Sequence, residues 1–96
     1  MAAEDYNHEK IFTTAAVIAE KLGKNNDFYS GYVDASKNVP LNYDYHDERR
    51  LAYIRGRAFA IYSAAMKLPK ASWRNGMLSK AATQRLIMAI QARAVI

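Results

Sequence analysis

The segment Tyr43–Ala65, "YDYHDERRLAYIRGRAFAIYSAA", contains the strongest helix signal in this chain of 96 residues. Its aliphatic positions recur at alternating spacings of three and four residues, a pattern typical of a helix that packs against another helix. These positions are Leu51, Ile54, Ala58, Ile61 and Ala65. We expect Asp44 to cap the helix, and Asp47 and Glu48 to lie in its first turn, where the helix dipole favours negative charge. The helix should end before Pro69.

Two shorter helical patterns precede this segment. Residues 7–22 carry an apolar stripe with helical spacing, and Gly23 follows as a natural C-terminal stop. Aromatic residues at helical spacing predict a short helix over residues 27–36, although Gly31 weakens that signal. Pro40 removes a backbone donor and therefore marks a turn between this helix and the next.

The last part of the chain predicts one more helix. Residues 67–76 are typical of a linker or a short helical turn, after which Ser79 can cap a helix that ends near Ala94. No segment alternates convincingly between apolar and polar residues as a strand would. The sequence therefore predicts an all-α fold, a small bundle of three or four helices.

Gly56 interrupts an otherwise strong helix pattern. Glycine in a helix interior costs about 1 kcal/mol relative to alanine, so it needs a compensating reason. We expect another backbone to approach closely at Gly56, that of the first or the last helix. Close approach of an RNA or a partner protein is the alternative.

Length and composition predict a single helical domain over residues 1–96, within the range of ordinary globular proteins. The chain has no cysteine, which excludes disulfides and a cysteine-ligated zinc site. No apolar run is long enough to span a bilayer, and the acidic, polar N-terminal stretch is unlike a secretory signal. We therefore expect a cytoplasmic protein that does not associate with membranes.

Charge is distributed very unevenly along the chain. All nine acidic residues lie in residues 1–48, and with four lysines they give this half a formal charge of −5. Residues 49–96 carry ten basic residues and no acidic one, a charge of +10. Such asymmetry predicts an anionic partner, either nucleic acid or a host nucleoprotein or nuclease complex. The alternative is that the two halves fold against each other and partly neutralise their charges.

Arg50, Tyr53 and Arg57 are spaced to form one stripe of cation, aromatic ring and cation. An exposed stripe of this kind suits phosphate contacts with a base stacked on the ring. The alternative is that Tyr53 packs on a neighbouring element. Together with other residues of the basic half, the stripe defines the predicted partner-binding set. Its members are Arg49, Arg50, Tyr53, Arg55, Arg57, Lys67, Lys70, Trp73, Arg74, Lys80 and Arg85.

Two residues of the predicted linker suggest further roles. Trp73 is either a half-buried anchor or an interaction hot spot, because tryptophan and arginine are enriched at hot spots and Arg74 follows it. If the Leu68–Pro69 bond lies exposed, its isomeric state is a candidate switch that a prolyl isomerase would set.

The stretch His46–Glu48 invites a metal or acid–base interpretation. Adjacent residues on a helix point in different directions, and no second ligand stands at helical spacing from His46. No phosphate-binding glycine loop or nucleophile motif occurs elsewhere. We therefore expect no catalytic residues, no metal and no cofactor.

Residues 30–60, "SGYVDASKNVPLNYDYHDERRLAYIRGRAFA", resemble the ribosome modulation factor family and related short phage proteins. The positions that carry the resemblance are Gly31, Tyr32, Pro40, Tyr43, Arg50, Gly56 and Ala60. The chain departs from the family pattern because its proline and tyrosine are not adjacent, Tyr53 stands where a tryptophan is usual, and 36 residues follow. The resemblance implies binding to ribosomal RNA and silencing of ribosomes.

These observations favour a non-enzymatic binding protein. In general style the chain is similar to phage-encoded inhibitors of host nucleic-acid enzymes, such as inhibitors of the RecBCD nuclease and anti-CRISPR proteins, which act in the bacterial cytoplasm. A ribosome-binding modulator is one alternative. An oligomeric structural protein that uses the 51/54/58/61/65 positions between chains is another.

Overall fold

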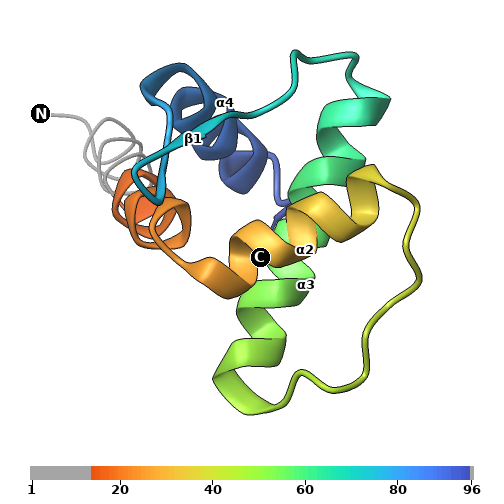
Figure 1. The fold of residues 1–96 in the computed structure, drawn as a ribbon. Helices are drawn as coiled ribbons and strands as arrows, with labels where there is room; N and C mark the ends of the chain where they lie inside the picture. The colour runs from red at the N-terminus through yellow and green to blue at the C-terminus, as the bar shows by residue number, and fades with distance from the viewer. Residues whose placement is uncertain (1–13, 96) are drawn as a thin grey trace, which may run out of the picture.

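Four helical segments make up most of the part of the chain that the computed structural model describes, residues 14–95 (Figure 1). The first helix covers the described residues 14–23, and the others are α2 (Asn26–Ser36), α3 (Asp47–Ala65) and α4 (Lys80–Gln91). The predicted all-α class and small helical bundle are confirmed. None of the helices described has the length and apolar character needed to pass through a membrane.

Helices α2 and α3 form the central contact of the fold and cross at a pair of glycines (Figure 1). A Cβ atom on Gly56 would collide with the carbonyl oxygen of Phe28, and one on Gly31 would collide with the carbonyl oxygen of Tyr53. Each glycine thus makes room for the backbone of the other helix. The predicted close approach at Gly56 is confirmed, but the approaching helix is α2, because only α2 offers a second glycine at the crossing.

The face of α3 that packs inward is not the predicted one. The buried residues of this helix are Ala52, Tyr53, Gly56, Phe59, Ala60 and Ser63. The predicted aliphatic row lies on the opposite side, where Leu51 is 49% exposed and Ile61 is 61% exposed. The face around Gly56 packs inward because this glycine lets α2 approach closely. The same face carries the large rings of Tyr53 and Phe59, whose burial removes much apolar area from water.

The core between the helices is rich in aromatic residues. Phe28 and Phe59 stack with their ring centroids 5.9 Å apart, and both are fully buried. Leu86 from α4 and Val95 complete this cluster. The first helix contributes Ala15, Ala19 and Leu22, as its apolar stripe predicted. Ile18 of the same predicted stripe is half-buried against the core, and its remaining members, Ile11 and Phe12, lie outside the described residues.

The helix termini agree with the sequence in part. Asp47 and Glu48 occupy the first turn of α3 as predicted. The predicted cap Asp44 is wrong, because His46 takes the N-cap position and makes no side-chain capping bond. The N–H of Asp44 instead donates to the side chain of Asn42 at 2.9 Å, within a loop that folds back on α3.

The last helix begins as predicted and ends early. The hydroxyl of Ser79 accepts a hydrogen bond from the N–H of Ala82 at 3.2 Å and so caps α4. The helix ends at Gln91 and not near Ala94. Arg93, two residues beyond, adopts a left-handed conformation with φ of 61°, which is incompatible with a continuing right-handed helix. Gly23, predicted as a stop, is the last helical residue of the first helix.

The predicted linker contains a small hairpin. Strands β1 (Trp73–Arg74) and β2 (Met77–Leu78) pair in antiparallel register, with Trp73 opposite Leu78. Asn75 and Gly76 between them have φ of 55° and 75°, the left-handed values of a tight hairpin turn. The Asn–Gly dipeptide was the available signal for this turn, and the two-residue strands were too short to show alternation.

We expect Gly76→Ala to lower the free energy of unfolding by about 1 kcal/mol, because alanine at positive φ is strained. Nothing lies within 4 Å of a Cβ at this position, so backbone strain is the sole source of the effect. Urea denaturation followed by circular dichroism measures it. An alanine variant as stable as the parent protein would contradict the left-handed turn.

Candidate partner-binding surface

Tyr53, the central ring of the predicted basic stripe, is fully buried. Its hydroxyl donates to Oδ2 of Asp34 at 2.7 Å and accepts from the N–H of Asn42 at 3.2 Å. The ring of Tyr45 stacks on it with the centroids 4.1 Å apart and the planes 11° from parallel. The prediction that Tyr53 stacks a nucleic-acid base is therefore wrong, and the alternative of packing on a neighbouring element is confirmed.

Arg57, the second cation of the stripe, serves the fold. Its guanidinium donates to the carbonyl oxygen of Val39 at 2.8 Å and to the hydroxyl of Tyr53 at 3.4 Å. It therefore ties the loop between α2 and α3 to the middle of α3. Arg50 remains exposed and lies 6.0 Å from the ring of Tyr43, which is itself 72% exposed. Arg50 and Tyr43 therefore form an exposed cation–aromatic pair in place of the predicted Arg50–Tyr53–Arg57 stripe. Helical spacing could not predict this pair, because Tyr43 lies in a loop.

Arg49 joins the two halves of the chain. Its guanidinium lies 3.0 Å from Oδ1 of Asp27, at the start of α2. The pKa of Arg49 is raised above its ordinary value, chiefly because its side chain hydrogen-bonds to Asp27 and also because of the charge of that carboxylate. Among the described residues this is the ion pair that links the acidic half to the basic half. Direct ion pairing between the halves is thus limited to Arg49 and Asp27 in that part of the chain.

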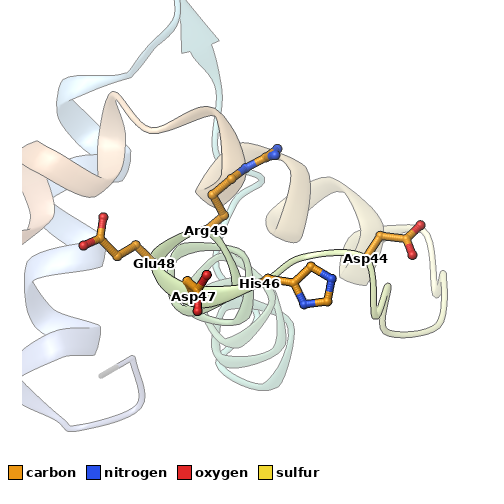
Figure 2. Close-up of a pocket in the computed structure, with 5 residues that line it drawn as sticks. All are labelled: Asp44, His46, Asp47, Glu48 and Arg49. Atoms are coloured by element: carbon orange, nitrogen blue, oxygen red, sulfur yellow. The ribbon is translucent and has the colours of Figure 1, made fainter.

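The His46–Glu48 region forms a shallow hollow at the start of α3 (Figure 2). The side chains of Glu48 and Arg49 point to different sides of the helix, and Asp44 points away from both. In residues 14–95 no group of three or more histidine or acidic side chains could hold a metal ion. The arrangement does not bring an acid, a base and a nucleophile together, and we assign it no chemistry.

Other cations of the predicted partner-binding set lie between α3 and α4, in residues 66–80. We name this segment the basic connection; its last residue, Lys80, is also the first residue of α4. Lys67, Lys70, Arg74 and Lys80 are all exposed there, and none has a carboxylate within ion-pair distance among the described residues. Arg55 and Arg85, on α3 and α4, are half-buried, and their Nε atoms are shielded from water. Their charges are accordingly less accessible to a partner than those of the basic connection.

The basic connection is held in place by the core. The N–H of Ala71 donates to the hydroxyl of Tyr32 at 2.9 Å, and the N–H of Ser79 donates to the carbonyl of Ser72 at 2.8 Å. Trp73 is half-buried, with its ring centroid 5.0 Å from that of Tyr29 and 5.1 Å from that of Tyr32. The anchoring role of Trp73 is confirmed. Its role as a hot spot stays a prediction.

Pro69 is exposed within the basic connection, as the hypothesis of a prolyl switch requires. A role for a prolyl isomerase stays a prediction.

Comparisons of the chain with protein-family models, with curated proteins and with solved structures gave no match.

Proposed function

We propose that this chain is a non-enzymatic cytoplasmic protein that binds the nucleic-acid component of a host nucleic-acid-processing complex, as a phage-encoded accessory or inhibitor would. The observation that carries the proposal is the basic connection, whose four exposed cations have no carboxylate partners among the described residues. Uncompensated positive charge on an ordered segment favours a polyanion, since each contacted phosphate releases condensed counterions.

The layout of these cations suits a phosphate backbone. The length of a fully extended chain limits the distances between the Cα atoms of these residues. It allows at most about 10 Å between Lys67 and Lys70 and at most about 14 Å between Lys70 and Arg74. One strand of nucleic acid can therefore contact all three. The hydrogen bonds of Ala71 and Ser79 order this backbone before binding, so little conformational entropy remains to be lost there. No base-reading element accompanies these cations in the described part of the chain, and we expect binding with little sequence preference.

The triple substitution Lys67→Gln, Lys70→Gln and Arg74→Gln is expected to weaken binding to labelled oligonucleotides. It should also reduce the slope of log affinity against log salt by about 2 to 3, roughly one for each lost phosphate contact. Fluorescence anisotropy over a series of salt concentrations measures both quantities, with single-stranded and double-stranded RNA and DNA as separate probes.

The matched control removes three exposed lysines of the acidic half: Lys21→Gln, Lys24→Gln and Lys37→Gln. Both triple variants have the same net charge, so a difference between them reports the position of the charges. If the two variants lose affinity equally, the basic connection is not the binding site. If the parent protein binds no oligonucleotide at low salt, direct nucleic-acid recognition is wrong.

Affinity capture from bacterial lysate distinguishes the kind of complex. We expect subunits of a nuclease or of a CRISPR effector, in amounts that fall with the Lys67, Lys70 and Arg74 triple variant. Recovery of ribosomes in their place would overturn the proposed target and favour the ribosome-binding alternative.

A further inference from the structure

The outward face of α3 carries a continuous row of apolar residues, which we name the α3 seam. Its members are Leu51, Ile54, Ala58, Ile61 and Ala65. The two largest exposed members are Leu51, at 49%, and Ile61, at 61%, whereas Ile54 and Ala58 are half-buried and Ala58 packs partly against the core of its own chain. At 100° per residue these positions lie within about 80° of arc, opposite the buried face, and span about 21 Å. Single exposed apolar residues are ordinary, but a row of this length indicates an interface.

We propose that a second copy of this chain covers the α3 seam, with the two α3 helices antiparallel. The spacing fits a twofold axis at Ala58, because the seam extends seven residues to either side of it. The exposed part of Ala58 would then face Ala58 of the second copy, where the small side chain permits close approach. Leu51 would face Ala65, so that a large side chain meets a small one at each end. Ile54, four residues before the axis, would lie close to Ile61 of the second copy, three residues after it.

The charges at the two ends of α3 favour the antiparallel orientation. Asp47 and Glu48 lie in the first turn, and Lys67 follows the last turn. Glu48 stands ten residues before Ala58 and Lys67 nine residues after it, so each acid would lie beside a lysine of the other copy. A parallel pair would instead bring the four carboxylates of two first turns together, and like charges at that distance are destabilising.

This interface does not rest on the proposed nucleic-acid function, but it shares one residue, Lys67, with the basic connection. The basic connection follows the C-terminal end of α3, so the antiparallel pair would hold two such segments at opposite ends. In each of them Lys70, Arg74 and Lys80 would stay accessible to nucleic acid.

Sedimentation equilibrium of the full chain over a wide range of concentrations tests the proposal. We expect a monomer–dimer equilibrium whose dissociation constant rises at least about 30-fold in Ile61→Glu, since a buried, unpaired charge costs about 2 kcal/mol or more. Met88→Glu is the matched control. Met88 is an equally exposed apolar residue, at 62%, but it lies on α4 outside the seam, and its substitution should leave the equilibrium unchanged.

Disulfide cross-linking tests the relative orientation of the two α3 helices. Because the chain has no cysteine, each introduced cysteine is the sole thiol of its protein. Under mild oxidation, a mixture of Leu51→Cys and Ala65→Cys proteins should form the mixed disulfide, whereas Leu51→Cys alone should form none. A disulfide between two molecules of the Leu51→Cys protein would overturn the antiparallel arrangement. A monomer at every concentration, or equal effects of Ile61→Glu and Met88→Glu, would overturn the dimer and leave the seam to another partner.

Discussion

Gly56→Ala is expected to lower the free energy of unfolding by about 3 kcal/mol or more, which is a large part of the stability of a domain of this size. The added Cβ would collide with the carbonyl group of Phe28 and would lie 2.9 Å from the backbone nitrogen of Tyr32. These atoms belong to the backbone of α2, which cannot move aside as a flexible side chain could. Urea denaturation followed by the fluorescence of Trp73, the sole tryptophan, measures the loss.

The direction of the change in stability caused by Gly56→Ala distinguishes a closely packed helix from an isolated one. In an isolated helix the same substitution is stabilising by about 1 kcal/mol, because alanine is the better helix former. Ala64→Leu, at an exposed position of the same helix, is the matched control and should change stability by less than about 0.5 kcal/mol. A Gly56→Ala protein as stable as its parent would contradict the close crossing of α2 and α3.

Tyr53→Phe is expected to lower the free energy of unfolding by about 1 to 3 kcal/mol. The ring would stay in place, but Asp34 would lose the hydroxyl that donates to it at 2.7 Å, and the N–H of Asn42 would lose its acceptor. Leaving polar groups unsatisfied in a partly buried site costs their desolvation energy. Because the hydroxyl also joins the loop between α2 and α3 to the helix, amide hydrogen exchange at Asn42 should become faster.

Tyr43→Phe is the control for this substitution. Tyr43 is largely exposed, so removing its hydroxyl should change stability by less than about 0.5 kcal/mol. Equal effects of the two substitutions would mean that the hydrogen bonds of Tyr53 do not hold the loop. A destabilisation confined to Tyr53→Phe would support the conclusion that this residue is structural and does not bind a partner.

The features that could be predicted from the amino-acid sequence are those that depend on neighbouring residues. Helix periodicity located the described helices, and Ser79 and the acidic first turn of α3 were predicted from the chemistry of helix ends. These features are local, because a cap or a first turn involves residues only a few positions apart. Gly56 likewise indicated a close backbone approach, since no other benefit offsets its cost in a helix interior.

Which side of α3 faces inward became clear only from the packing of the helices. Both sides carry apolar residues at helical spacing, so periodicity could not choose between the seam and the face around Gly56. The choice depends on Gly31, a residue 25 positions away, whose missing Cβ admits α3 only at that face. The same crossing buries Tyr53 and ties Arg57 to the loop. It leaves the cations of the basic connection and two members of the α3 seam, Leu51 and Ile61, exposed.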